Sequence, residues 1–377
     1  TRQVQEGNLL IVDGNTGEVI IEPDGDIIIH YQEKQLQLSK YKSSILRISH
    51  LPAETVDGHK IAIQANIEFL EEVATAREHG AEGVGLYRTE FLYLRSGRVP
   101  SEEELFEDYK EVAGILAPAP VTIRTLDIGG DKFSSDLNLT REMNPALGLR
   151  AIRFSLREPQ IFKNQLRAIL RASAYGHIQL MFPMISGLQE LLEAKKILGE
   201  VKDQLDREHV KYDRGVRVGI MIEIPSAVTM ADDLAKHCDF FSIGTNDLIQ
   251  YALAIDRINE HVAYMYQPFH PAILRMIQDV VRTARKAGIK VALCGEMAGD
   301  PLCVLVLVGL GLDELSMNAQ AIPMIKKIIR LISMEEAQAD LEDLLQLNMA
   351  EAVRKFILKR MKSIVELDEK GLYIKAL

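Results

Sequence analysis

Short apolar runs alternate with amphipathic segments along most of the chain, from about residue 60 to residue 318. The segments between the runs have the spacing of helices, and several end at a glycine that favours a helix stop: Gly80, Gly176 and Gly288. Nearly continuous apolar strands separated by helices are typical of a parallel sheet covered on both faces. Eight such units predict an α/β fold, a closed (β/α)8 TIM barrel. The runs are IAIQANI (61–67), GVGLYR (83–88), VTIRTLD (121–127), IQLMFPM (178–184), VRVGIMIEI (216–224), CDFFSIGT (238–245), KVALCGE (290–296) and ELSMN (314–318).

Smaller elements are expected on either side of the barrel pattern. Residues 8–22, NLLIVDGNTGEVIIE, predict two strands around a Gly-Asn-Thr-Gly turn, and residues 30–48 predict a connecting helix. An isolated hairpin is marginally stable in water, so we expect this one to be the tail of a domain that begins upstream of the chain. Residues 335–366 predict a helical extension. The expected division is therefore 1–48 (tail and linker helix), 49–334 (barrel) and 335–377 (C-terminal helical extension).

Composition and charge narrow the classes of function. The chain has 377 residues and a net charge of −10, which argues against non-specific binding to nucleic acid. Its longest apolar run, PLCVLVLVGLGL, is shorter than the roughly 20 residues of a membrane span, and the polar start TRQVQEGNLL is unlike a signal peptide. Three cysteines at low density are typical of a reduced protein. We expect a cytoplasmic protein that binds neither nucleic acid nor membrane.

Several arginines stand where strands of the predicted barrel end, and barrel active sites lie at the carboxyl ends of the strands. An arginine inside a β-rich run, as at Arg124, is unusual because an unpaired buried charge is costly. One interpretation is a structural ion pair with Asp127 or Glu90. The other is an anion site, since guanidinium binds phosphate and carboxylate bidentately. The four candidates are Arg88, Arg124, Arg150 and Arg257.

Two carboxylates follow neighbouring predicted strands. Glu223 ends the run GIMIEIPSA, and Asp247 follows the next run, beside Asn246. Taken singly, Asp247 could be a helix N-cap, a position that Asp favours. Together, two carboxylates with substrate oxygens are the usual way in which a protein holds Mg²⁺. We therefore expect Glu223 and Asp247 to be metal ligands.

One cysteine ends a predicted strand, and the other two lie in apolar surroundings. Cys294 closes KVALC and precedes a glycine, where its side chain could face the mouth of the barrel and act as proton donor or nucleophile. Its simpler interpretation is a small buried hydrophobe, and this is our expectation for Cys238 and Cys303. The spacing of cysteines and histidines does not fit zinc, and His177 and His270 are expected to be structural.

Long motifs in the chain resemble the C-terminal domain of the Enzyme I family, the phosphoenolpyruvate–protein phosphotransferases of the bacterial phosphotransferase system. The resemblance covers about residues 8–332. It implies a (β/α)8 barrel that binds phosphoenolpyruvate (PEP) and Mg²⁺ and forms a homodimer through the barrel. The motifs are GAEGVGLYRTEFL, TIRTLDIGGDK, NPALGLRAIR, MFPMIS, DFFSIGTNDLIQYALAIDR and CGEMAGD.

Roles for the site residues are implied by the same resemblance. Arg88, Arg124 and Arg257 would hold the phosphate or carboxylate of PEP, helped by Arg150. Asn246 and the backbone of Asp247 would add contacts, and Lys132 would be a further phosphate contact. Glu223 and Asp247 would hold Mg²⁺, and Cys294 would protonate the enolate to give pyruvate.

The sequence departs from the family pattern in one respect, and other enzymes remain possible. The family's phosphoryl-accepting histidine lies in a Gly-rich Thr-Ser-His-type motif on a swivelling domain, and no histidine here has that context. We expect that domain upstream of the chain, with the hairpin as its tail, and a histidine-phosphocarrier protein as the partner. The alternatives are the barrel of a PEP synthase or pyruvate phosphate dikinase, or a non-catalytic regulatory module.

Overall fold

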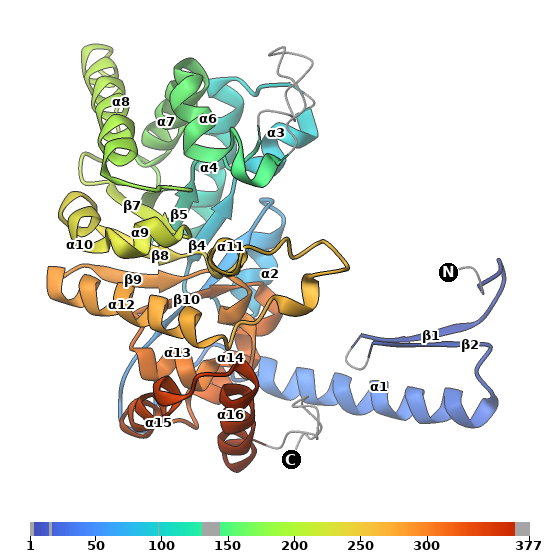
Figure 1. Cartoon of the computed structure of the whole chain (residues 1–377). Coiled ribbons are helices and arrows are strands. Elements are labelled where there is room, and N and C mark those ends of the chain that lie inside the picture. The colour runs from blue at the N-terminus through green and yellow to red at the C-terminus, as the bar shows by residue number, and fades with distance from the viewer. Residues whose placement is uncertain (1–3, 15–16, 97, 130–143, 366–377) are drawn as a thin grey trace.

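The computed structural model describes residues 4–14, 17–96, 98–129 and 144–365. Its centre is a closed barrel of eight parallel strands, in the order β10-β3-β4-β5-β6-β7-β8-β9 (Figure 1). The barrel closes where Glu314 of the last strand pairs with Ala62 of the first. This confirms the predicted (β/α)8 TIM barrel. The strands are β3 (Ala62–Ile67), β4 (Val84–Arg88), β5 (Val121–Arg124), β6 (Ile178–Phe182), β7 (Arg217–Ile222), β8 (Phe240–Ile243), β9 (Lys290–Leu293) and β10 (Glu314–Met317).

Helices surround the barrel and bury the outward-facing side of each strand. They are α2 (Glu72–Glu78), α3 (Glu90–Ser96), α4 (Glu102–Leu116), α6 (Ala151–Arg157), α7 (Pro159–Ala172), α8 (Leu188–Arg207), α9 (Pro225–Thr229), α10 (Ala231–Leu234), α11 (Thr245–Leu253), α12 (Pro271–Ala287), α13 (Val304–Leu310) and α14 (Ile322–Ile329). Short 3-10 turns are η2 (Pro145–Leu147), η3 (Ala235–His237), η4 (Ala263–Met265), η5 (Glu296–Gly299) and η6 (Ala319–Ala321). Within the described residues, no helix combines the length and apolar character needed to cross a membrane.

Two layers of apolar packing hold the barrel. The larger lies between the strands and the surrounding helices, which is why both faces of the strands read as apolar. The smaller lies inside the barrel and forms the floor of its open end. Its members are Leu86, Met181, Met221, Phe240 and Cys294.

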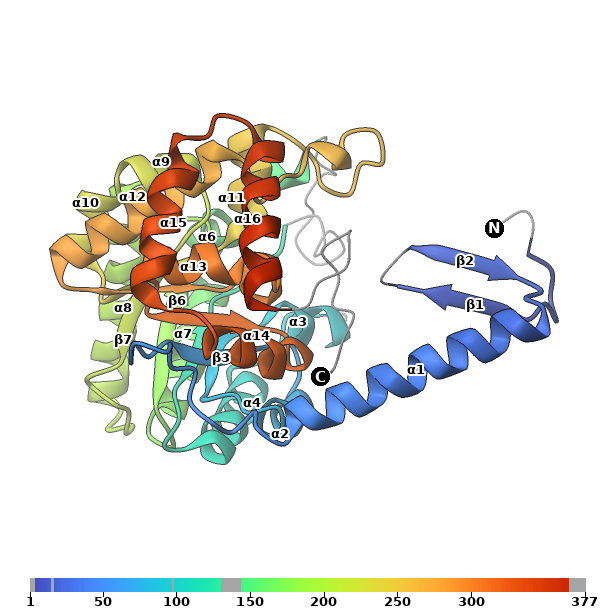
Figure 2. The same ribbon diagram turned by 90° about the horizontal axis from the view of Figure 1, so that it is seen from below.

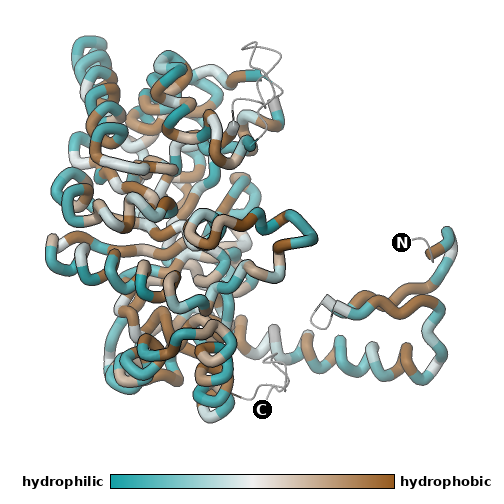
Figure 3. The backbone as a smooth tube through the Cα atoms, in the orientation of Figure 1, coloured by the Kyte–Doolittle hydropathy of each residue, from teal (hydrophilic) through white to brown (hydrophobic). Residues whose placement is uncertain are grey.

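The N-terminal part stands away from the barrel as an arm. Strands β1 (Leu10–Asp13) and β2 (Glu18–Ile21) form the predicted antiparallel hairpin, which rests on helix α1 (Gly25–Leu46) (Figures 1 and 2). The helix begins earlier than predicted because the side chain of Asp24 caps it, accepting a hydrogen bond from Ile27 N–H. Both strands of the hairpin carry apolar residues (Figure 3), and several of these are exposed; Val12 is 70% exposed.

The predicted C-terminal helical extension is present, but it is not one continuous helix. The segment forms two helices, α15 (Met334–Gln346) and α16 (Ala350–Ile364), because the backbone becomes extended at Leu347. Helix α15 packs closely on α13: a Cβ added to Gly309 would lie 2.3 Å from the Ala337 carbonyl oxygen. Helix α15 therefore covers the outer side of α13, which belongs to the helical layer around the barrel.

Candidate active site

A cavity of about 1090 Å³ opens at the carboxyl ends of the barrel strands. All eight residues that the sequence singled out as site residues line it: Arg88, Arg124, Arg150, Glu223, Asn246, Asp247, Arg257 and Cys294. Lys132 lies outside the described residues. Strands and loops far apart in the sequence thus place their polar side chains around one space, as a closed barrel requires.

Arg124, the last residue of β5, is the most deeply buried of the four guanidiniums, with a side chain that is 11% exposed. It donates to Glu90 Oε1 at 2.7 Å and lies 3.0 Å from Asp127 Oδ2. The ion pairs considered from the sequence are therefore present. Its Nε–H, however, is buried without a partner among the described residues, so the same side chain keeps a donor available.

The two more exposed guanidiniums each contact one carboxylate at the rim. Arg88 donates to Glu68 Oε1 at 2.8 Å, and Arg257 donates to Glu296 Oε1 at 2.8 Å. Asn246 also contacts Glu296, since its Oδ1 accepts from Glu296 N–H at 2.9 Å. The rim acids thus occupy donors that an anionic ligand could use.

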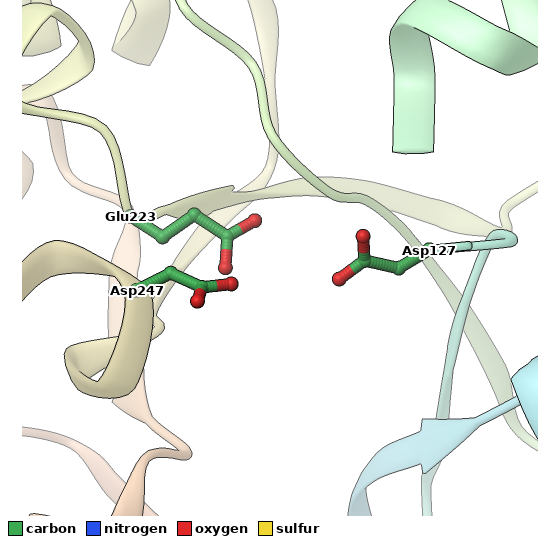
Figure 4. A group of neighbouring side chains, drawn as sticks. All are labelled: Asp127, Glu223 and Asp247. Carbon is green, nitrogen blue, oxygen red and sulfur yellow. The ribbon is translucent and has the colours of Figure 1, made fainter. Parts of the chain in front are cut away.

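Three carboxylates face one another in the cavity, with Glu223 and Asp247 side by side and Asp127 pointing toward them from across the gap (Figure 4). Asp127 follows β5, Glu223 follows β7 and Asp247 lies in the first turn of α11; one oxygen from each lies within 4.8 Å of the others. Arg150 contacts two of them, Asp127 at 2.8 Å and Asp247 at 3.4 Å. Three oxygen donors at this spacing could hold a metal ion.

Burial and mutual repulsion govern the ionisation of these acids. Glu223 is 1% exposed and accepts from Met184 N–H at 2.7 Å. Burial raises the pKa of Glu223 to about 8, and the charges of Asp247 and Asp127 add to the effect. Burial also acts on Asp127, but the guanidiniums of Arg124 and Arg150 outweigh it and hold the pKa of that carboxyl below its usual value. The ionised form of Glu223 is therefore disfavoured unless a cation lies beside it.

The described lining residues carry more negative than positive charge. Seven carboxyl side chains and four guanidiniums face the cavity. A polyanion entering this space would meet net repulsion unless a divalent cation came with it. The charge balance therefore indicates a site for a cation and an anion together.

Cys294 lies in the floor of the cavity, and its side chain is 2% exposed. Its sulfur accepts a hydrogen bond from the Ser242 hydroxyl at 3.2 Å, and its S–H points to the Ile243 carbonyl oxygen at 3.7 Å. Burial raises the pKa of the Cys294 thiol to about 11, although the Ser242 hydrogen bond and Arg124 oppose burial. At neutral pH this residue is a protonated thiol beside the cavity.

Comparison with known proteins shows the family to which the chain belongs. Residues 42–334 match the family described as "PEP-utilising enzyme, PEP-binding domain". The chain belongs to this family.

Several relatives of this PEP-binding domain are similar over nearly its whole length. It is 48% identical over 357 residues to the phosphoenolpyruvate-protein phosphotransferase of Geobacillus stearothermophilus, covering 95% of this chain and 62% of the relative. It is 46% identical to that of Bacillus subtilis (strain 168), covering 96% and 64%, and 45% identical to that of Staphylococcus carnosus (strain TM300), covering 94% and 62%. The chain therefore spans less than two thirds of the length of these relatives.

Among the acidic residues that line the cavity without having been assigned a site role from the sequence, Asp127 and Glu296 are the most informative. Asp127 was considered only as an ion-pair partner of Arg124, although it too follows a strand end. Glu296 was not considered, although it comes two residues after Cys294 at the start of η5. Position after a strand was the available signal in both cases.

Glycines let the strand ends approach one another. A Cβ on Gly295 would lie 1.9 Å from Thr245 Oγ1, and a Cβ on Gly244 would lie 2.8 Å from Glu223 Oε2. No side chain fits in either place without movement of its neighbours. The two glycines thus allow Cys294, Glu223 and the first turn of α11 to lie close together along the cavity of the PEP-binding domain.

Proposed function

We propose that this chain is the PEP-binding part of a phosphoenolpyruvate–protein phosphotransferase. In this proposal the cavity holds PEP with Mg²⁺, the phosphoryl group leaves to a histidine outside the barrel, and the remaining enolate becomes pyruvate. The observation that supports it best is the convergence of four guanidiniums, three carboxylates and a buried thiol on one cavity. The names of relatives that are 45% to 48% identical favour the same activity.

Asp127, Glu223 and Asp247 fit a Mg²⁺ ion, because all three supply hard carboxylate oxygens and Glu223 is buried among like charges. When bound, the cation would neutralise charge on the phosphate and on the developing enolate. Its presence would also offset the excess of carboxylates in the cavity.

The guanidiniums would bind the anionic groups of PEP. Arg88 and Arg257 would exchange their rim partners, Glu68 and Glu296, for phosphate or carboxylate oxygens of PEP. Arg124 would contribute its free Nε–H from below. Arg150 and Asn246 would complete the cradle. Phosphoryl transfer depends mainly on such positioning and charge neutralisation, so no nucleophile of the barrel is required.

Cys294 would supply the proton that turns the enolate into pyruvate. Its S–H bond breaks, the electron pair stays on sulfur, and a C–H bond forms at C3 of the enolate. Because burial raises the pKa of this thiol to about 11, the proton remains on sulfur until the strongly basic enolate carbon is present.

The phosphoryl acceptor would come from outside the barrel. None of the chain's nine histidines lines the cavity in the described structure. We propose that the acceptor is a histidine in the remainder of a longer protein, and that it passes the group to a histidine-phosphocarrier protein. Assembly as a homodimer and a cytoplasmic location belong to the same proposal.

Ligand-linked unfolding tests the proposal on the chain itself. PEP with Mg²⁺ at 100 times the dissociation constant should stabilise the fold by about 2.7 kcal/mol, a readily measured rise in melting temperature. Neither ligand alone should match this rise, and Arg124→Met should abolish it. Glycerol 3-phosphate, which lacks the carboxylate, is the control ligand. A melting temperature that PEP with Mg²⁺ leaves unchanged would show that the barrel is a non-catalytic module.

An assay of the longer protein would distinguish the phosphotransferase from the alternatives that use ATP. A phosphotransferase passes phosphate from PEP to a histidine-phosphocarrier protein with no nucleotide added. A synthase or dikinase forms a phosphorylated enzyme from PEP but needs a nucleotide to complete its reaction. Transfer to the carrier only when nucleotide is present would therefore contradict the proposal.

A further inference from the structure

Ser242 is a buried polar residue at the centre of β8 that the roles proposed above leave unused. It interrupts the apolar run Phe240, Phe241 and Ile243, and it is 1% exposed. A hydroxyl buried in such surroundings is destabilising unless it is hydrogen-bonded. Its placement inside the barrel therefore requires a specific partner.

That partner is the sulfur of Cys294. The Ser242 hydroxyl donates to Sγ at 3.2 Å, across the contact between β8 and the end of β9. Within the described residues the Ser242 side chain makes no other hydrogen bond. Buried serines more often bond a nearby carbonyl of their own segment, as Ser173 does with Leu170 O at 2.6 Å. The Ser242 hydroxyl is instead committed to the thiol.

A partly buried side chain fixes the backbone of the same cysteine. Asn66 at the end of β3 donates its Nδ2–H to the Cys294 carbonyl oxygen at 3.0 Å. The carbonyl and the sulfur of Cys294 are thus held by Asn66 and Ser242, and the long 3.7 Å contact of the S–H with the Ile243 carbonyl oxygen is the one to be given up when the thiol donates into the cavity.

We infer that Ser242 is the positioning residue for proton donation by Cys294. The inference rests on the proposed function, in which that thiol protonates the enolate. When the proton moves to carbon, the sulfur becomes a thiolate, and the Ser242 O–H remains intact and donates to it. A hydrogen bond to a charged acceptor is stronger than one to a neutral acceptor, so the contact strengthens as the proton leaves. Ser242 therefore favours the transferred state over the resting state.

Alkylation of Cys294 tests the contact without metal or substrate. Ser242→Ala should raise the pKa of the Cys294 thiol by up to one unit, which lowers the fraction of thiolate about tenfold. Because a thiolate of higher pKa is also more nucleophilic, alkylation by iodoacetamide at a given pH should slow by only roughly fourfold. Peptide-resolved mass spectrometry from pH 7 to 10 would measure it, separately from Cys238 and Cys303. Ser242→Thr keeps the hydroxyl and should restore the rate. Ser173→Ala, which also removes a buried hydroxyl, should leave it unchanged.

Hydrogen exchange of pyruvate tests the consequence for the reaction. In D₂O with Mg²⁺, the chain should exchange the methyl hydrogens of pyruvate, because the thiol step is reversible. Ser242→Ala should slow this exchange at saturating pyruvate while leaving the affinity for PEP within about twofold, and Ser242→Thr should restore it. Cys294→Ala should abolish it.

The two experiments separate failure of the inference from failure of the proposed function. If Ser242→Ala folds, binds PEP and alkylates at the rate and pH profile of the parent chain, Ser242 does not act on the thiol and the inference is wrong. Normal exchange in Ser242→Ala also overturns it. If the parent chain neither binds PEP nor exchanges pyruvate, the proposed function fails, whatever the alkylation result.

Discussion

At the scale of single residues, the site is built from charges that compensate one another in pairs. Arg124 lies between Glu90 and Asp127, and Arg257 lies against Glu296. A buried guanidinium without such a partner would be strongly destabilising. The same pairing means that a ligand has to displace acids already present. Glu223 is the exception, because after burial the charges that act on it most strongly are those of two other carboxylates, Asp247 and Asp127.

Glu223→Gln should therefore change stability and binding in opposite directions. Burial beside Asp247 and Asp127 raises the pKa of Glu223 to about 8, so folding at neutral pH has to protonate this carboxylate. The neutral amide removes that cost, which should raise the melting temperature of the ligand-free chain. Losing a carboxylate ligand should weaken Mg²⁺-dependent binding of PEP by roughly tenfold or more. Calorimetric titration and thermal unfolding of the same samples would measure both. A lower melting temperature together with an unchanged metal requirement would remove Glu223 from the ligand set.

Glu314 lies at the opposite end of the barrel, partly buried, and accepts from Gln64 Nε2–H at 2.9 Å. Burial raises the pKa of Glu314 to about 7; the nearby Asp313 and Glu82 add to this, and Lys290 opposes it. The folded protein thus holds a proton that the unfolded chain releases at lower pH. The free energy of unfolding should fall as pH rises from about 4.5 to 7, by up to about 3 kcal/mol, and then level off.

Glu314→Gln should remove this part of the pH dependence, because the amide does not ionise and still offers Gln64 an acceptor. The variant should be more stable than the parent chain at pH 8, with a smaller difference at pH 5. Melting temperatures at the two pH values would measure it, with the exposed Glu342→Gln as control. The same difference at both pH values would contradict the assignment.

At the scale of elements, the strands are short, and the residues that end them or follow them form the site. Strands β5, β8 and β9 have four residues each, and Asp127, Asp247 and Cys294 all lie just beyond them. Small residues at these turns decide how closely neighbouring segments approach. Helix α11 begins against Gly295 in this way.

Gly295→Ala should displace the first turn of α11. The new methyl would overlap Thr245 Oγ1 at 1.9 Å and Thr245 N at 2.8 Å, so Asn246 and Asp247 would have to move. We expect a loss of stability of roughly 1–3 kcal/mol and weaker binding of PEP with Mg²⁺. Gly199→Ala in α8 is the matched control: its added methyl meets nothing within 4 Å, and the change should stabilise the helix by about 0.5–1 kcal/mol. Equal effects of the two substitutions would contradict the steric account.

At the scale of the whole molecule, sequence reasoning located the barrel strands well and some site contacts poorly. Each predicted apolar run contains one observed strand, because burial on both faces leaves a clear pattern. That Asp127 reaches Glu223 and Asp247 depends on how the closed barrel brings β5, β7 and β8 together, which no local pattern encodes. The helical character of the C-terminal extension was predicted, but its division at Leu347, where the backbone becomes extended, was not.

The arm and the barrel should also be separable in stability. The hairpin's ion pair is with α1, where Lys34 donates to Asp13 at 2.6 Å, whereas α1 joins the barrel at its other end through the buried Tyr41. Deleting residues 1–22 should shift the melting temperature of the barrel by no more than about 2 °C. Tyr41→Ala should lower barrel stability by roughly 2–4 kcal/mol. Calorimetry of both variants would test this, and a large shift on deletion would show that the hairpin supports the barrel.

Closure of the barrel has a consequence for the order in which the chain acquires its shape. The hydrogen bonds Gln64–Glu314 and Ser316–Asn66 each join residues 250 positions apart. At roughly 5–20 residues per second, a ribosome needs about 12–50 s between making one partner and the other. During that interval the edge of β3 that will pair with β10 is unpaired, and the barrel cannot close around the cavity. A ligand of the cavity therefore cannot guide early folding, because its site is complete only after the last strand has been made. Until then an extended β3 would offer an edge to which other chains can pair.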